Sequence, residues 1–432
     1  MIEPFSLPLN KSEFQQTLRQ GLGRARLHLQ KHGNDWVEAI LMEACLSNLA
    51  YDPQCEGNRA PWLVELIYQS ARPEMLIASL LPQLPADVEN YWDATQRCRI
   101  ALNLAQRGVQ GAREVLYACL RYSLLTKDII GASEIVEFDS ADGLVHVATF
   151  LGSRKLADPN FYCCENPLFI YNDRFGQFSG NVLLQSLARD SPAIQCYLQN
   201  IDDHQNRRAE YQAGQEVTPS ISFELAYQDL QSFDSLGFLA QFVTWAKTAN
   251  ETEWSRMLEL VHFNAPLNQI RALLSIFERR QFENCPQALF KFVKHPEYNA
   301  RQWAFSTLGN FKHPEIRAIA EELLSAGKVT GDEILLFKHN YQAGDIDQIY
   351  NALQVPEDQH QLHSLIMNIA RISESIGTPE LFPLLLFGYE RTPCSSCRGR
   401  LVKELVELDV IPGWIAAECE HDAVSETRAL VC

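Results

Sequence analysis

Residues 299–324 read NARQWAFSTLGNFKHPEIRAIAEELL, and this stretch decides the fold class. Ala304 and Leu308 stand at the four-residue spacing of an amphipathic helix, and Gly309 follows where such a helix would end. A His-Pro turn then leads into a second segment with helical periodicity. Proline suits the first turn of a helix, where its missing N–H is not needed, so the stretch predicts two helices joined by a tight turn.

The same proline-containing turn before a helix recurs through the C-terminal half. His-Pro-Glu stands at 295–297 and again at 313–315, one helix and a turn apart, and Thr378-Pro379-Glu380 repeats the design. Thr330 followed by Glu333 fits a capping box. One helix pair cannot bury its apolar face alone, whereas stacked neighbours can, so the pattern predicts an array of helix pairs.

The unit at 299–324 resembles the HEAT repeat, a helix pair with a proline near the first turn and an arginine or lysine at the second helix. The resemblance covers about residues 260–431, with a second copy of the pattern at 397–431. In the first half, ALNLAQRGVQGAREVLYACL at 101–120 looks like one such unit. The resemblance implies an all-α fold, a right-handed α-solenoid of HEAT-like helix pairs of a bacterial type. HEAT motifs are degenerate, so they indicate an architecture and no activity.

A polar stretch, DDHQNRRAEYQAGQEVTPSIS at 202–222, separates the two halves. Its composition is typical of a loop, and its length favours two domains over one seamless array. We therefore expect an N-terminal helical domain at 1–203, a linker or long loop at 204–222 and a HEAT-like repeat domain at 223–432. Whether the first half is a distinct helical domain or the start of one continuous solenoid stays open.

Composition narrows the function classes. The chain has 432 residues, and we find no run of the ~18 apolar residues that a membrane helix needs. Its first residues have no basic segment followed by an apolar one, so we expect a cytoplasmic protein that contacts no membrane. The net charge of −17 has the wrong sign for general nucleic-acid binding. We read the twelve cysteines as reduced thiols.

One stretch carries a net positive charge although the whole chain is acidic. Between residues 271 and 317, eight lysines and arginines face four glutamates. On the concave face of a solenoid, these side chains would bind an acidic segment of another protein, and a phosphate group or nucleic acid would be a weaker alternative. A solvated face with internal salt bridges is the other interpretation. The candidate binding residues are Arg271, Arg279, Arg280, Arg301, Trp303, Lys312 and Arg317.

Four residues near the C-terminus have the chemistry of a metal site. Cys394 and Cys397 form a CxxC pair, and Cys419 is followed two residues later by His421. The two CxxC thiolates, together with Cys419 and the imidazole of His421, would hold zinc tetrahedrally. The alternatives are cysteines that only pack between helices, or a redox pair whose thiolate is favoured by a helix N-terminus and Arg398.

Catalytic motifs are missing from the sequence. We find no GxxxxGK[ST], no HExxH and no GxSxG. We therefore expect a non-catalytic protein-binding scaffold or adaptor that uses the concave face of a solenoid and needs no cofactor other than zinc. A regulatory module of a bacterial stress or defence system would be one version of this role. The alternative is a HEAT-type enzyme or enzyme subunit, such as the lyases that attach tetrapyrroles to proteins, although no residue here matches that activity.

Overall fold

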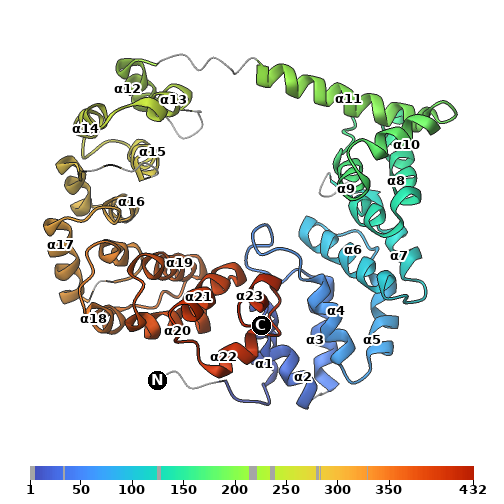
Figure 1. Cartoon of the computed structure of the whole chain (residues 1–432), viewed down its shortest axis with the longest axis horizontal. Helices are drawn as coiled ribbons and strands as arrows, with labels where there is room; N and C mark the ends of the chain where they lie inside the picture. The colour runs from blue at the N-terminus through green and yellow to red at the C-terminus, as the bar shows by residue number, and fades with distance from the viewer. Residues whose placement is uncertain are drawn as a thin grey trace. The chain divides into compact units, whose positions relative to one another are not determined.

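The computed structural model describes residues 5–32, 35–123, 128–213, 221–233, 239–278, 282, 284–327 and 329–432. Helices make up nearly all of its regular structure, which confirms the all-α prediction (Figure 1). The strands in the described part are β1 (Arg121–Tyr122) and β2 (Ile129–Ile130), which pair antiparallel. Within these ranges, no helix has both the length and the apolar character needed to cross a bilayer. The chain divides into two compact units.

The N-terminal unit runs from Phe5 to the end of α11 and also takes in Glu418–Ser425. Its longest helices pack side by side, with α8 against α9 and α11, and with α6 against α4 and α7. Its helices are α1 (Lys11–Gln20), α2 (Arg24–His32), α3 (Asp35–Leu46), α4 (Ala60–Gln69), α5 (Pro73–Leu80), η1 (Leu81–Gln83), α6 (Tyr91–Gln106), α7 (Ala112–Ala118), α8 (Ala132–Ala157), α9 (Asn166–Phe175), α10 (Ser179–Ala188) and α11 (Pro192–Ala213).

The segment Glu418–Ser425 completes this unit from the far end of the chain. Arg24, at the start of α2, donates to the buried carboxylate of Glu418 through Nε at 2.5 Å and Nη2 at 2.8 Å. The backbone comes equally close, because a Cβ on Gly23 would lie 1.9 Å from the carbonyl oxygen of Glu418. Trp62 on α4 donates its indole N–H to the carbonyl of His421 at 3.0 Å. The segment is therefore part of the core, not a tail.

The C-terminal unit contains α12 to α21 and most of the last residues of the chain. Its helices are α12 (Phe223–Gln231), α13 (Ala240–Thr248), α14 (Glu251–Leu260), α15 (Leu267–Glu278), η2 (Gln287–Lys294), α16 (Tyr298–Leu308), α17 (Pro314–Ser325), η3 (Asp332–Phe337), α18 (Asp345–Ala352), α19 (Gln359–Ile376), η4 (Pro379–Leu381), α20 (Phe382–Arg391) and α21 (Ser395–Glu407). Two short helices, α22 (Gly413–Cys419) and α23 (Ser425–Ala429), are each divided between the two units, because the boundaries fall after Ala417 and after Ser425.

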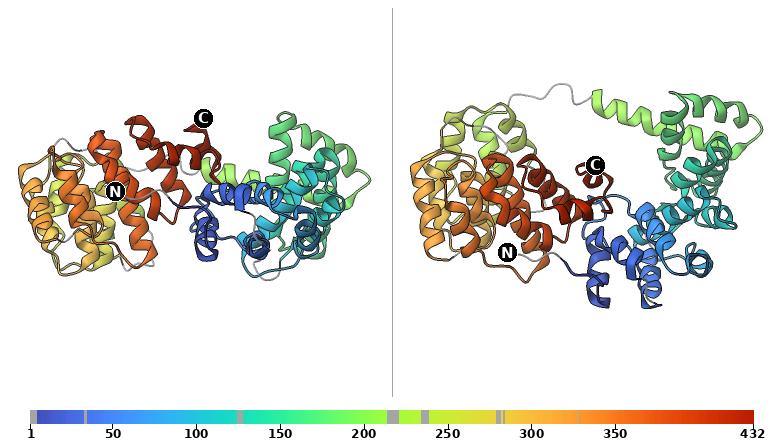
Figure 2. Two further views of the ribbon diagram at one scale, coloured as in Figure 1. Left: turned by 90° about the horizontal axis from the view of Figure 1, so that it is seen from below. Right: turned by 60° about the horizontal axis from the view of Figure 1, so that its bottom comes forward.

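Helices of the C-terminal unit pack in chain order. A first row consists of α15, α16, η3, α19 and α21, and each of these elements packs on the next one. In a second row, α14 packs on η2, α17 on α18, and α18 on α20. The rows are joined because η2 packs on α16, α17 on η3, and α20 on α21. Figures 1 and 2 show this succession from yellow to red. The apolar faces are covered by sequence neighbours.

The two His-Pro-Glu turns use one device. In each, the histidine Nδ1 accepts a backbone N–H from the glutamate two residues later: Glu297 at 3.1 Å from His295, and Glu315 at 3.2 Å from His313. Pro314 opens α17, as the sequence predicted. His313 is the N-cap of α17 and thereby accepts one of the N–H groups that a helix leaves without an internal partner. At α16 the same hydrogen bond lies just before the helix, because Glu297 is the N-cap there. Of the predicted Thr330–Glu333 capping box, one half is present, because Glu333 accepts the Thr330 N–H at 3.2 Å. The N-cap of η3 is Gly331, one residue later than predicted, and it makes no side-chain cap hydrogen bond.

The predicted domain boundaries differ from the structure in two places. Residues 204–213, expected as linker, continue α11, because arginine, glutamine, glutamate and alanine are good helix formers even in a segment with little apolar character. The rest of that stretch up to residue 220 lies outside the described residues. The second difference is Glu418–Ser425, which was assigned to the repeat domain and belongs to the N-terminal unit.

Candidate functional site

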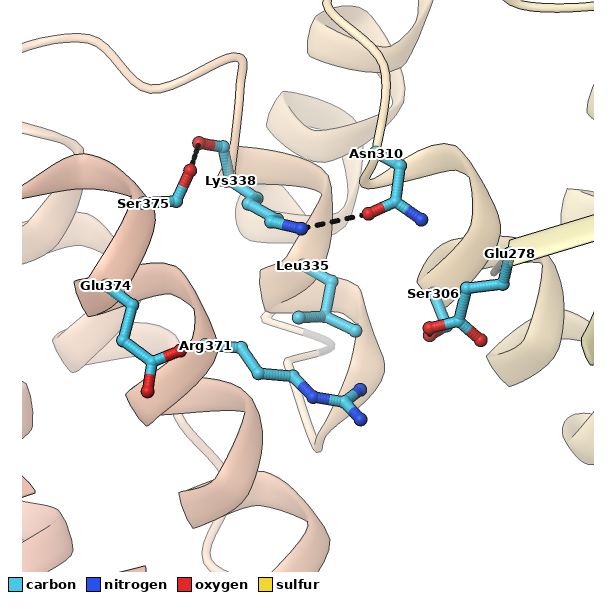
Figure 3. A pocket seen from close by; sticks show the side chains of 8 residues that line it. All are labelled: Glu278, Ser306, Asn310, Leu335, Lys338, Arg371, Glu374 and Ser375. Atoms are coloured by element: carbon cyan, nitrogen blue, oxygen red, sulfur yellow. Dashed lines mark hydrogen bonds between the residues drawn. The ribbon is translucent and has the colours of Figure 1, made fainter. Parts of the chain in front are cut away.

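A polar groove crosses four successive elements of the first row. It is a cavity of about 470 Å³ at the C-terminal ends of α15, α16 and α19 and around η3 (Figure 3). Its walls alternate acidic, neutral and basic groups, in contrast to the apolar contacts beneath. The residues that line the polar groove are Glu278, Ser306, Asn310, Leu335, Lys338, Arg371, Glu374 and Ser375.

Hydrogen bonds tie the walls of the groove together. The Ser306 hydroxyl donates to Glu278 at 2.6 Å, and Lys338 Nζ donates to the side chain of Asn310 at 2.9 Å. The Ser375 hydroxyl donates to the Lys338 carbonyl at 3.1 Å. These links join residues 28, 28 and 37 positions apart in the sequence. Each link therefore connects one helix pair to the next, and the groove keeps its shape across the row.

Arg371 is the prominent cation of the groove. Its side chain extends into the space between α19, η3 and α16 (Figure 3). It makes no hydrogen bond or ion pair with any other described residue. The neighbouring carboxylate of Glu374 is already occupied, because Arg400 donates to it through Nε at 2.9 Å and Nη2 at 2.7 Å. The arginine can therefore receive an anionic group from outside without breaking an internal pair.

Asp332 adds a titrating charge beside Arg371. Its carboxylate is partly buried at the start of η3 and accepts a hydrogen bond from the side-chain amide of Asn368. Burial raises the pKa of Asp332 to about 6, and the Asn368 hydrogen bond and the Arg371 charge oppose this by favouring the ionised form. The electrostatic field at Arg371 therefore changes in the weakly acidic range.

The predicted basic residues have different roles in the structure. Arg271 and Lys312 are exposed and Trp303 is partly buried, whereas Arg279 and Arg280 lie outside the described residues. Arg301 donates to the carbonyls of His295 and Pro296 at 2.7 and 2.8 Å, which fixes the first His-Pro turn. This arginine therefore has an internal structural partner.

Arg317 is engaged even more fully. It forms a bidentate ion pair with the buried carboxylate of Asp345, and its Nε donates to Glu321 at 2.7 Å. These hydrogen bonds raise the pKa of Arg317 above its ordinary value. Arg317 thus joins α17 to α18, and the internal salt bridge that the sequence left as an alternative is present at this position.

The predicted zinc ligands are divided between the two units. Cys394 is the N-cap of α21, and Cys397 lies on its first turn. Both are buried in the C-terminal unit, whereas Cys419 and His421 belong to the N-terminal unit. The four-residue set stays a prediction. The structure adds His363 from α19, whose ring Nε2 lies 3.1 Å from Cys397 Sγ. A lone histidine 31 residues before the first cysteine carries no spacing signal in the sequence.

The N-terminal unit carries an apolar patch on α9 and α10. Phe169, Phe178 and Val182 are each at least 60% exposed, and Phe175 is nearly half exposed. Phe178 has a left-handed backbone, with φ at 68°, which is costly for a bulky side chain. α9 and α10 pack on each other, and exposed apolar side chains grouped on neighbouring helices can mark a contact with another molecule.

No family model, curated protein or solved structure matches this chain. Its function therefore has to be inferred from the groove, the patch and the cysteine cluster themselves.

Proposed function

We propose that this chain is a non-catalytic scaffold whose C-terminal unit is a right-handed solenoid of HEAT-like helix pairs and binds an extended acidic segment of another protein. Two features support the solenoid: the helices of this unit pack in chain order, and polar links recur between neighbouring pairs. Stacked helix pairs of this kind present long surfaces suited to extended partners.

The observation that carries the proposal is Arg371 in the polar groove. Its guanidinium has no ion pair or hydrogen bond among the described residues, and Lys338 supplies a second positive charge on the adjacent element. The glutamates at the two ends are engaged by Ser306 and Arg400. A carboxylate is the natural complement at the centre, because a planar guanidinium binds it in a bidentate manner.

Groove length sets the size of the segment. Four packed elements at interaxial distances of about 8–10 Å span roughly 30 Å, which an extended chain of about ten residues covers. The partner segment would therefore be short and extended, with an acidic side chain near its middle.

A labelled peptide tests this role. The probe is a fluorescein-labelled peptide of about ten residues that alternates glutamate and serine, long enough to span the groove. Its fluorescence anisotropy is titrated with the full-length protein at low and moderate salt. We expect Arg371→Ala to weaken binding by about tenfold, the loss of roughly 1.4 kcal/mol.

Arg271→Ala is the matched control, because Arg271 is an exposed arginine of the predicted basic stretch outside the groove lining. It should bind the peptide like the wild type. A loss with Arg271→Ala and none with Arg371→Ala would place the site on the basic stretch and refute the groove. No binding by the wild-type protein at low salt would refute the acidic-segment proposal altogether.

The apolar patch of the N-terminal unit supports the scaffold role independently, since a scaffold needs more than one contact surface. The enzyme alternative stays a prediction, without residues to carry it.

A further inference from the structure

His363, Cys394 and Cys397 form a compact cluster in the C-terminal unit. Their ligand atoms, one imidazole nitrogen and two sulfurs, all lie within 4.8 Å of one another. The cluster arises because α19 packs against α21, which brings the second turn of α19 to the N-terminus of α21. Packing alone brings these residues from two separate helices together.

Local structure holds the cysteine pair in place. Thr392 is buried just before α21, and its hydroxyl both accepts the Cys394 N–H at 3.2 Å and donates to the Cys394 carbonyl at 3.1 Å. Cys394 then occupies the N-cap position of α21, and Cys397 follows on its first turn. A helix N-terminus favours thiolates, which are the form that binds metals. The pair is thus fixed in place at the start of the helix.

The geometry suits a tetrahedral metal ion. Zinc bonds of about 2.3 Å to sulfur and about 2.0 Å to nitrogen put sulfur and nitrogen about 3.6 Å apart, and two sulfurs about 3.8 Å apart. The 3.1 Å between His363 Nε2 and Cys397 Sγ, and the 4.8 Å limit of the cluster, bracket these separations. Shifts of about 1 Å or less in the three ligand atoms would bring them to bonding distance from one zinc ion.

We propose that His363, Cys394 and Cys397 bind one Zn²⁺, which joins α19 to α21, with water in the fourth position. Among the common divalent ions, zinc is the one best suited to a site of two thiolates and an imidazole. Each thiol releases its proton to solvent as its Zn–S bond forms, so affinity falls as the pH is lowered. Both cysteines are buried while His363 is partly exposed, which places the water on the histidine side.

Zinc content decides the proposal. The full-length protein, purified without chelators and dialysed against Zn²⁺, should hold about one zinc per chain by elemental analysis, since the three ligands form one site. His363→Gln and Cys397→Ser should weaken zinc binding by about a hundredfold or more, because loss of a second-shell partner alone costs 10–100-fold. His360→Gln is the matched control: it lies one turn earlier on α19, outside the cluster, and should keep its zinc.

Cobalt spectroscopy separates loss of a ligand from loss of the fold. Co²⁺ bound to the wild-type protein should show thiolate charge-transfer bands, which weaken by about half in Cys397→Ser and persist in His363→Gln with altered d–d bands, because only the first substitution removes a sulfur. Circular dichroism should show unchanged helicity in both variants.

Three results would overturn the proposal. One is a folded wild-type protein that takes up no zinc. Another is His363→Gln that binds zinc as tightly as the wild type, which would favour the set with Cys419 and His421. The third is a Cys394–Cys397 disulfide, detected by mass after alkylation under denaturing conditions, in protein purified without oxidant.

Discussion

The two units are both helical, but they differ in how far apart in the sequence the partners of their buried ion pairs lie. In the N-terminal unit, Arg24 reaches Glu418 across a sequence separation of 394 residues. In the C-terminal unit, the comparable ion pair joins Arg317 to Asp345, only 28 residues apart. The first unit depends on the end of the chain, and the second on neighbours in a row. A local sequence pattern can therefore reveal the second kind of closure and not the first.

The largest expected effect breaks the long-range closure. Glu418→Ala removes the buried carboxylate with which the guanidinium of Arg24 forms an ion pair, and removal of one member of a buried pair costs about 3–5 kcal/mol. We expect lower stability and faster hydrogen exchange in α1 and α2, measured by mass spectrometry under native conditions. The exchange of α15 to α19 should change little.

Glu65→Ala is the control in the same unit. Glu65 pairs with Arg26 at 3.4 Å with both side chains substantially exposed, and such pairs contribute about 0–1 kcal/mol. If Glu418→Ala were no more destabilising than Glu65→Ala, the distant segment would not be part of the core.

The corresponding change in the C-terminal unit is Asp345→Ala. It removes the buried partner of Arg317, but the arginine is partly exposed and keeps its contacts with Glu321 and the Asn340 carbonyl. The loss should therefore be smaller, about 2–3 kcal/mol, in urea unfolding followed by circular dichroism. Glu321→Ala removes the exposed (i, i+4) partner of the same arginine and should cost at most about 0.5 kcal/mol. Equal effects would show that burial of Asp345 is not what matters.

The contrast also explains how much could be predicted. The His-Pro-Glu turns and the contact of Glu333 with the Thr330 N–H are encoded within a few residues, so the sequence located them, but it placed the N-cap of η3 one residue too early. The all-α class follows from the same local patterns. The partner of Arg317 depends on how far α17 and α18 rotate against each other, which no spacing rule records. His363 meets Cys397 for the same reason. The polar groove could not be predicted from the sequence, because its residues form no motif and come together only when four elements pack in a row.

The charge of Asp332 beside the groove can be followed through the pH dependence of the free energy of unfolding. Its pKa is raised to about 6, mainly by burial, so the folded protein holds this proton more tightly than the unfolded chain. Its contribution to stability is present below the unfolded pKa and is lost as the pH rises through about 6. Asp332→Asn keeps the acceptor for Asn368 and removes the charge, so it should stabilise the protein by about 2 kcal/mol at about pH 8. Thermal unfolding should show this gain vanishing below about pH 4, where both side chains are neutral.

The smallest expected effect concerns binding at the same residue. Ionised Asp332 adds a negative charge near Arg371 without pairing with it, and so weakens the attraction of the groove for an external carboxylate. Lowering the pH from about 7.5 to about 5.5 protonates Asp332 while glutamates of a bound peptide, with pKa values near 4.3, stay charged. The wild-type protein should then bind the glutamate–serine peptide about two- to fivefold more tightly, a change of roughly 0.4–1 kcal/mol. Asp332→Asn should bind tightly at both pH values, and Arg371→Ala should show no pH dependence. A pH dependence that survives in Asp332→Asn would mean that another group, not this carboxylate, controls the charge of the groove.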